Sequence, residues 1–133
     1  MVKGERTRVY EVAPAAMWKT IGDFHALHTW HPGIADSRPS EDGKARTLVL
    51  PDDGGTIIET QTGEGDLHYS YRIDESPLPV KDYESMLMVR DADGSAEVIW
   101  SAEFEVDGVT EEEATELMHG FIDAGFDNIG ASA

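Results

Sequence analysis

Hydrophobic and polar positions change their spacing along the chain, and each change predicts a different kind of element. Residues 5–12 alternate in the way that is typical of a β-strand. Pro14 then suits the first turn of an α-helix, where its missing N–H is not needed, and this helix is expected to run to about Gly22. The chain therefore begins with a strand followed by a short helix.

A second short helix is predicted directly after the first, with Asp23 as its cap. Pro32 and Gly33 close this helix after about two turns. Its apolar residues recur at every third position, and we expect them to form a buried stripe: Phe24, Leu27 and Trp30. Because these helices and an aromatic-rich turn interrupt a chain of strands, we interpret residues 12–33 as a lid over a cavity.

Residues 34–106 have the pattern of successive strands separated by turns. Glycine, proline, aspartate and other turn-forming residues gather at 41–43, 51–55, 63–66, 76–79 and 91–94. Strands joined by such short turns pair with their neighbours, so the sequence predicts an antiparallel meander of about six or seven strands.

The last segment returns to helical spacing. Thr110, followed three residues later by Glu113, forms a capping box that predicts the start of a helix. Apolar or small residues then recur on one helical face: Ala114, Leu117, Met118, Phe121, Ile122, Gly125 and Ile129. A long amphipathic helix is therefore expected to end the chain. Since no repeat or linker divides the sequence, we predict a single domain over residues 1–133.

Alternation within the strands indicates which side chains face the core. Tyr69, Tyr71 and Ile73 alternate with polar residues and are expected to point inward. If the turn at 63–66 places Glu59 opposite Tyr71, the inward positions on the two preceding strands follow: Ile57, Glu59 and Gln61, and Arg46, Leu48 and Leu50. A cation, a carboxylate and two phenols then share an otherwise apolar concave surface.

A second inward row has the clearest alternation in the chain: Val98, Trp100, Ala102, Phe104 and Val106. The strand that contains Met86 and Met88 is compatible with two registers, so its inner face stays unassigned. A long meander buries a terminal helix by curling around it, which predicts an α+β helix-grip architecture.

The order of these elements and several short motifs resemble the START/Bet v 1-like (SRPBCC) superfamily, specifically its polyketide cyclase/dehydrase-like bacterial branch. The resemblance covers nearly the whole chain and rests on residues spread along it: Ala13-Pro14 with Trp18, Gly22-Asp23-Phe24, Trp30-His31-Pro32-Gly33, Arg46, Glu59, Tyr69 with Tyr71, Pro77-Leu78-Pro79-Val80 with Tyr83, and Trp100 with Phe104. It implies a deep, mainly apolar cavity between the sheet and the long helix. Different members use this cavity to bind or transport hydrophobic ligands, or for ring-closing and dehydrating chemistry.

Polar and aromatic residues on the inner face form the candidate ligand-binding site: Arg46, Glu59, Tyr69, Tyr71, Trp100, Phe104, Phe24, Trp30 and Phe121. Burying the Glu59 carboxylate is unfavourable unless Arg46 pairs with it. The pair is either a structural ion bridge between adjacent strands or a set of polar groups that orients a ligand or transfers protons. In the catalytic case, the candidate residues are Glu59, Arg46 and Tyr71.

Three classes of function follow from this site. The main hypothesis is a module that binds a small hydrophobic molecule, with Arg46 and Glu59 recognising its polar end. The second is a cyclase, aromatase or dehydratase in which Glu59 is the base and Arg46 or a tyrosine stabilises an enolate. The third is an interaction protein whose vestigial cavity is filled by Trp18, Trp30, Trp100 and Phe121.

Composition narrows the choice of partners. With 27 Asp and Glu against 10 Lys and Arg, the formal charge is −17, so nucleic acid and anionic membrane surfaces are not expected as partners. Such a surface fits a salty habitat or an ordinary acidic protein. The absence of cysteine excludes disulfides, thiolate metal ligands and a cysteine nucleophile. Neither a signal peptide nor a membrane span is apparent, and we expect a cytoplasmic location.

Three histidines invite a metal-binding hypothesis. His25, His28 and His31 are spaced by three, and Asp23 is near enough in sequence to add an oxygen ligand. A helix of this length does not hold all three imidazoles on one face, so neither a metal nor another cofactor is expected. His31 is instead expected at the mouth of the cavity.

Two further features have more than one interpretation. Trp18 is expected to be a core residue rather than a platform for a ligand. Gly120 and Gly125 lower the helix propensity of the last segment. They serve either close packing against the sheet or a looser helix that gives a ligand access.

Overall fold

The computed structural model describes residues 1–132 and consists of one curved antiparallel sheet and a long helix. Seven strands form the sheet in the order β1-β7-β6-β5-β4-β3-β2. Their bounds are β1 Val2–Tyr10, β2 Asp36–Pro39, β3 Ala45–Val49, β4 Thr56–Gly65, β5 His68–Glu75, β6 Val80–Ala92 and β7 Ser95–Val106. The helical segments are α1 Pro14–Ile21, the 3₁₀ turn η1 Leu27–Thr29, and α2 Glu111–Ser132.

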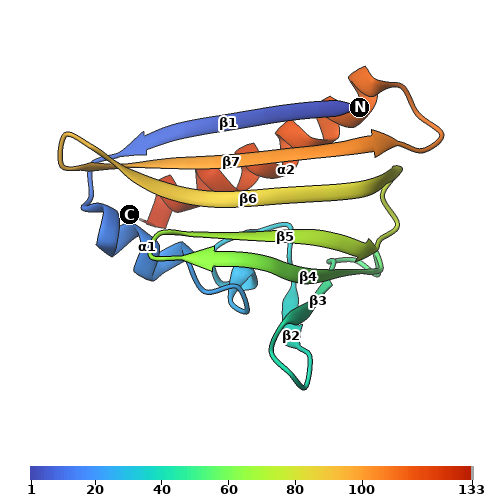
Figure 1. Cartoon of the computed structure of the whole chain (residues 1–133), viewed down its shortest axis with the longest axis horizontal. Coiled ribbons are helices and arrows are strands. Elements are labelled where there is room, and N and C mark those ends of the chain that lie inside the picture. Colours follow the sequence, from blue (N-terminus) through green and yellow to red (C-terminus); the bar gives the residue numbers. More distant parts are fainter. Residues whose placement is uncertain (133) are drawn as a thin grey trace.

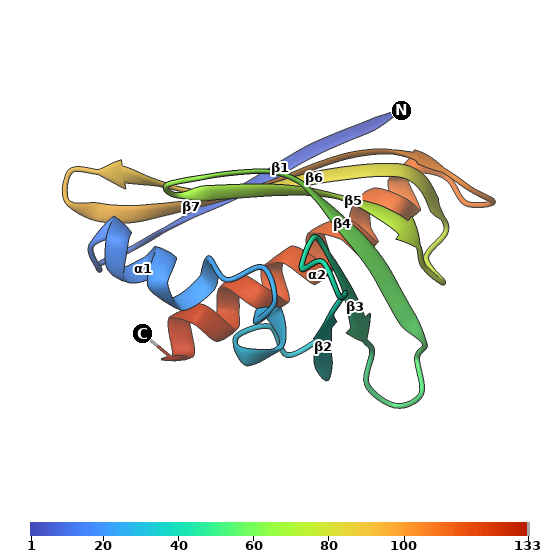
Figure 2. The same cartoon turned by 60° about the horizontal axis from the view of Figure 1, so that its bottom comes forward.

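The sheet curves around α2, which confirms the helix-grip prediction. In Figure 2 α2 runs along one face of the sheet, while β2, β3 and the first half of β4 turn down beside it. β1 completes the arrangement by pairing along the outer side of β7, so the first strand of the chain lies beside the last (Figure 1). Burial of the concave face and of one side of α2 creates a single core, in which Trp100 is 1% exposed.

Turn chemistry explains the hairpin between β6 and β7. Ala92 pairs with Ser95, so Asp93 and Gly94 alone form the loop between β6 and β7. Both have positive φ, 54° and 93°, as a type I′ turn requires. The predicted turn at 91–94 is therefore confirmed, and it lies at the tip of the hairpin.

The long helix begins as the capping box predicts. The hydroxyl of Thr110 accepts a hydrogen bond from the backbone N–H of Glu113 at 3.1 Å, and the Glu113 carboxylate accepts one from the Thr110 N–H at 3.4 Å. Most of the predicted apolar face is buried. Leu117 is the exception, since it is 55% exposed, and the sequence missed Phe126, which is buried.

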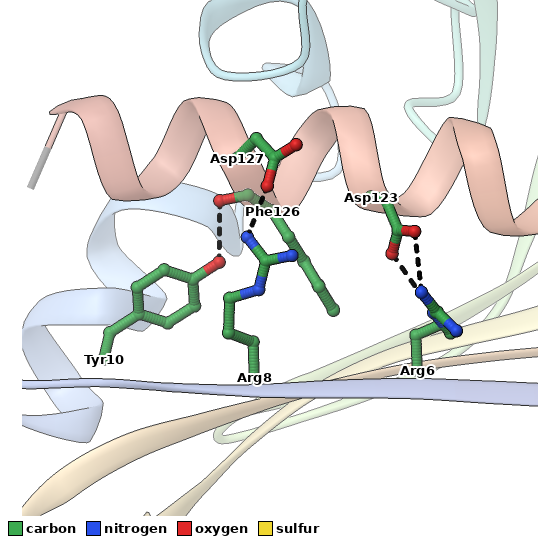
Figure 3. Close-up of polar contacts among 6 residues, drawn as sticks. All are labelled: Arg6, Arg8, Tyr10, Asp123, Phe126 and Asp127. Carbon is green, nitrogen blue, oxygen red and sulfur yellow. Dashed lines mark hydrogen bonds and ion pairs between the residues drawn. The ribbon is translucent and has the colours of Figure 1, made fainter.

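Figure 3 shows how α2 is attached to β1 through polar contacts. Arg6 forms two hydrogen bonds with the Asp123 carboxylate, at 3.1 and 2.7 Å. One turn further along α2, Arg8 bonds Asp127 at 2.7 Å, and the Tyr10 hydroxyl donates to the backbone carbonyl of Phe126 at 2.8 Å. Alternate side chains of one strand thus hold the second half of α2.

The segment after β1 differs from the prediction in two respects. β1 begins at Val2 and ends at Tyr10 rather than spanning 5–12. The second helix is shortened to the 3₁₀ turn η1, and the Asp23 carboxylate accepts a hydrogen bond from the His25 N–H in the loop before it. Phe24, Leu27 and Trp30 are nevertheless buried, as expected.

Strand register places Arg46 directly opposite Glu59 on β3 and β4. The condition that Glu59 pairs with Tyr71 is wrong, because Glu59 pairs with Ile73 and Gln61 pairs with Tyr71. The observed register of β4 and β5 thus differs from the predicted one by two residues, and the ladder is irregular between Ile58 and Glu59 and between Gln61 and Gly63. An even shift preserves the inward face, so Glu59 and Tyr71 still point to the core.

The unassigned strand also has a definite inner face. Ser85, Leu87 and Val89 are buried, whereas Met86 and Met88 lie on the opposite face and are partly buried. Val98, Trp100, Ala102 and Phe104 of the predicted row on β7 are buried, and Val106 is partly buried. Ile99, on the opposite face, is buried as well.

Candidate functional site

A cavity of about 240 Å³ lies between the concave face of the sheet and the first half of α2. Sixteen residues line it: Gly33, Leu48, Leu50, Ile57, Glu59, Tyr71, Ile73, Leu78, Pro79, Val80, Tyr83, Phe104, Ala114, Leu117, Met118 and Phe121. Leu78 and Leu117 combine this position with 39% and 55% exposure, which marks where the cavity meets solvent. The surface is mainly apolar, and Glu59 is the one acidic residue among the described residues that line it.

Arg46 and Glu59 form a buried ion pair at the back of this cavity. The Arg46 Nε donates a hydrogen bond to Glu59 Oε1 at 2.8 Å, and Nη2 lies 2.6 Å from the same oxygen. Nη1 donates to the backbone carbonyl of Phe24 at 2.6 Å. The guanidinium is thereby fixed by β4 on one side and by the loop after α1 on the other.

Aromatic rings cover the faces of the guanidinium. The Arg46 Cζ lies 4.0 Å from the ring centre of Phe24, 4.9 Å from that of Tyr71 and 5.6 Å from that of Tyr69. Rings at these distances stabilise a cation through their quadrupoles, particularly where water is excluded. Arg46 is therefore held in a closed polar and aromatic cage rather than presented to the cavity.

Burial acts on both members of the pair in opposite ways. Loss of water raises the pKa of the Glu59 carboxyl, and this effect exceeds the opposing attraction of Arg46. For Arg46, burial opposes the charged form, but Glu59 together with the neighbouring Tyr69 and Tyr71 outweighs this effect and raises the pKa of the guanidinium. The arginine therefore stays charged, whereas the Glu59 carboxyl is easier to protonate than an exposed one.

A hydrogen-bonded chain connects the cavity wall to the core. Trp100 Nε1 lies 3.2 Å from both the Tyr71 hydroxyl and the Ser85 hydroxyl and donates to them. Ser85 in turn donates to the Ser101 carbonyl at 2.7 Å. Burial also raises the pKa of Tyr71 and of Tyr83, so both phenols remain protonated in neutral solution.

The structure brings only some of the predicted site residues to the cavity. Glu59, Tyr71, Phe104 and Phe121 line it. Arg46, Tyr69 and Phe24 form the cage behind Glu59. Trp30 and Trp100 pack against each other with ring centres 5.6 Å apart, and neither lines the cavity.

His31 does not lie at the mouth of the cavity, contrary to the prediction. It is 1% exposed, and its ring stacks on Phe121 with centres 4.0 Å apart. Nε2 donates to the Phe121 carbonyl at 2.7 Å, while Nδ1 accepts from the Gly33 N–H at 2.9 Å. These partners select the neutral Nε2–H form, and burial lowers the pKa of His31.

The predicted lid packs against one end of the core. Within the described chain, Gly33 is the one residue of 12–33 that lines the cavity. Trp18 lies against Tyr69 with ring centres 5.9 Å apart and joins the core, as expected. The mouth is instead built from Leu78 and α2.

Tyr83 lines the cavity but was not among the predicted ligand-binding residues, and the same is true of several apolar lining residues on β6 and α2. Tyr83 stacks on Phe104 with ring centres 5.2 Å apart. The sequence carried little signal for the inner face of this strand, because the inward-facing Ser85 is more polar than Met86 and Met88 on the opposite face. The register shift between Lys81 and Glu84 interrupts any alternation before that point.

The histidines of the loop take separate partners rather than converging. His25 Nε2 contacts the Gly43 carbonyl at 2.8 Å, and His31 contacts α2. Among the residues that the structure describes, no group of three or more His, Cys, Asp or Glu side chains is arranged to hold a metal ion. Residues 1–132 likewise contain no helix long and apolar enough to cross a membrane.

Comparisons with known proteins agree with this architecture. The protein XoxI from Bacillus cereus is 32% identical, with a TM-score of 0.95 over 99% of this chain and 95% of its own. An uncharacterised Bacillus thuringiensis protein is 31% identical, with a TM-score of 0.94 over 98% of both chains. No curated protein sequence matches this chain.

More distant structures share the fold. The Zhui aromatase/cyclase from Streptomyces sp. R1128 is 14% identical, with a TM-score of 0.74 over 96% of this chain and 87% of its own. The model of the family described as "polyketide cyclase / dehydrase and lipid transport" matches residues 1–133. The chain therefore belongs to the polyketide cyclase/dehydrase and lipid transport family, and it shares its fold with a START superfamily protein from Mycobacterium smegmatis.

Proposed function

We propose that this protein binds a small hydrophobic molecule in the cavity between the sheet and α2. The observation that carries the proposal is the cavity itself, about 240 Å³ in volume and lined mainly by apolar side chains. Ligand sites are typically concave and apolar with a few polar groups that fix orientation. Glu59, Tyr71 and Tyr83 supply such groups here.

Naphthalene is a suitable first probe, because it is compact, apolar and without hydrogen-bonding groups. Titration monitored by NMR of the backbone amides is expected to give saturable shifts around Phe104 and Phe121. Ala114→Leu places additional carbon atoms in the cavity and is expected to abolish these shifts, since Ala114 lines it and is buried. Glu116→Leu, on the exposed side of α2, is the matched control and is expected to bind naphthalene like the wild type.

Two results contradict the proposal. One is the absence of saturable binding. The other is binding that Ala114→Leu leaves unchanged, which places the probe elsewhere on the molecule.

A second candidate function is proton transfer at a carbon next to a carbonyl group, as a cyclase or dehydratase requires. The observation that favours it is the position of Glu59, a carboxyl group of raised pKa that lines an apolar cavity beside Tyr71. The test is exchange of the α-protons of 2-tetralone in D₂O, followed by NMR. Exchange faster than in buffer and lost in Glu59→Gln supports this function, whereas exchange at the buffer rate excludes it for this ketone.

A further inference from the structure

The polar groups that line the cavity are acidic or phenolic rather than cationic. Its lining contains the carboxyl group of Glu59 and the phenols of Tyr71 and Tyr83, whereas none of the described lining residues is a lysine, arginine or histidine. A ligand that carries a negative charge therefore meets an acidic group and finds no exposed cation. This asymmetry bears on the kind of ligand that fits.

Arg46 does not supply the missing cation. Its side chain is fully buried, and it lies behind Glu59 rather than on the cavity surface. The Phe24 ring at 4.0 Å and the Tyr71 ring at 4.9 Å cover it, and Nη1 is committed to the Phe24 carbonyl. An anionic ligand would have to displace this packing to reach the guanidinium.

The two carboxylate oxygens of Glu59 are used differently. Both contacts with Arg46 are made by Oε1. Oε2 receives no hydrogen bond from residues 1–132, and Glu59 forms part of the cavity wall. A carboxylate oxygen is a strong acceptor, and a hydrogen bond to a charged group is stronger than one between neutral groups.

We infer that the ligand is a compact ring compound whose polar end is a neutral hydroxyl group that donates to Glu59, and that carboxylate-ended molecules are rejected. This inference rests on the proposed function. The cavity of about 240 Å³ is smaller than the range of about 300 Å³ and above that is typical of drug-sized ligands. The Arg46–Glu59 pair is neutral overall, so a ligand carboxylate beside it gains no charged partner. A ligand hydroxyl, in contrast, can donate a hydrogen bond to the open acceptor Oε2 of Glu59.

Three probes of nearly equal shape test the inference: naphthalene, 2-naphthol and 2-naphthoate, each titrated at neutral pH. We expect 2-naphthol to bind about tenfold more tightly than naphthalene, as one hydrogen bond to a charged acceptor provides. We expect 2-naphthoate to bind more weakly than naphthalene. Equal affinity of naphthol and naphthalene overturns the inference but leaves the proposed function in place, as does tightest binding of the naphthoate. Failure of all three overturns both.

Two variants test whether Glu59 is the cause of the preference for 2-naphthol over naphthalene. Arg46→Met combined with Glu59→Leu removes the pair without leaving an unpaired charge in the core. This double variant is expected to lose the preference, so that 2-naphthol and naphthalene bind with equal affinity. Glu75→Gln, which changes the same charge at an exposed position of β5, is the matched control and is expected to keep the preference. A naphthol preference that survives in the double variant overturns the assignment.

Discussion

Single side chains decide how much charge the core tolerates. Arg46 and Glu59 form an ion pair on adjacent strands, and the Phe24 carbonyl and three aromatic rings complete the surroundings of the guanidinium. A buried pair of this kind contributes little net stability relative to apolar residues of similar size, but removing one partner leaves the other charge uncompensated. The pair therefore acts as a unit.

This unit predicts strongly non-additive mutations. Glu59→Leu alone strands the Arg46 charge and is expected to lower the free energy of unfolding by about 3–5 kcal/mol. Arg46→Met added to Glu59→Leu removes that charge and is expected to restore most of the loss. Equilibrium unfolding in urea measures both. Similar stability of the single and double variants would contradict the coupling.

His31 is expected to make stability depend on pH. Its Nδ1 accepts a hydrogen bond from Gly33, so protonation there removes an acceptor and buries a charge. The folded pKa lies below 6.5, so between the two values the unfolded chain binds more protons than the folded one. The free energy of unfolding therefore falls as pH decreases from about 6.5 towards the folded pKa.

The measurement compares urea unfolding at several pH values for the wild type and His31→Gln. The difference in stability between them is expected to shrink as pH falls below about 6.5, because only the wild type loses the contribution of neutral His31. His119→Gln, a histidine on α2, is the control. A difference that stays constant with pH refutes the role of His31.

At the scale of elements, local patterns predicted the fold well. The capping box at Thr110, the Asp93-Gly94 turn and the inward row that includes Trp100 depend on neighbours close in sequence, and all three appear as expected. Leu117 has the right helical spacing but faces the open side of the cavity. Hydrophobic periodicity indicates which face of a helix a residue occupies, but it does not indicate whether other side chains pack against that face.

The site was less predictable because it depends on long-range register. Glu59 and Ile73 pair only because the β4–β5 ladder is irregular, and no residue type in that stretch requires those irregularities. His31 was misplaced for a similar reason, since its partners, Gly33 and the carbonyl of Phe121, include one that lies 90 residues away. The family resemblance predicted a cavity, but only the structure shows which residues line it.

Gly120 and Gly125 of α2 now have different explanations. A Cβ at position 125 would lie 2.7 Å from Cδ2 of His31 and 3.0 Å from Cζ3 of Trp30, whereas a Cβ at position 120 would have no neighbour within 4 Å. Gly125 therefore permits close packing of α2 against the aromatic core. Gly120 has no such requirement.

Alanine substitution separates them. Gly125→Ala is expected to destabilise the protein by about 1–3 kcal/mol, because the new methyl group overpacks the site. Gly120→Ala is expected to stabilise it by up to about 1 kcal/mol through helix propensity alone. Thermal and urea unfolding measure both. Destabilisation by Gly120→Ala, or tolerance of Gly125→Ala, would reverse the assignment.

At the scale of the whole molecule, an apolar cavity is enclosed by a strongly acidic protein. The formal charge of −17 arises from carboxylates spread along the entire chain. Several are paired across elements, such as Asp123 with Arg6 and Asp127 with Arg8 (Figure 3). Ten basic side chains cannot neutralise twenty-seven acidic ones, so repulsion remains after all ion pairs are formed.

This excess predicts that added salt stabilises the protein. The Debye length falls from about 30 Å at 0.01 M to about 8 Å at 0.15 M, which screens repulsion between carboxylates across the surface. Exposed ion pairs weaken over the same range of salt, but each contributes only about 0–1 kcal/mol to stability. The acidic side chains also outnumber the basic ones that could pair with them. The free energy of unfolding, measured in urea, is therefore expected to rise as the NaCl concentration increases from about 0.01 M to about 0.3 M. In a variant with the exposed Glu112 and Glu116 changed to glutamine, salt is expected to raise the free energy of unfolding less, because this variant carries less charge to screen. A decrease in stability with salt would show that the ion pairs, rather than the excess charge, dominate the surface.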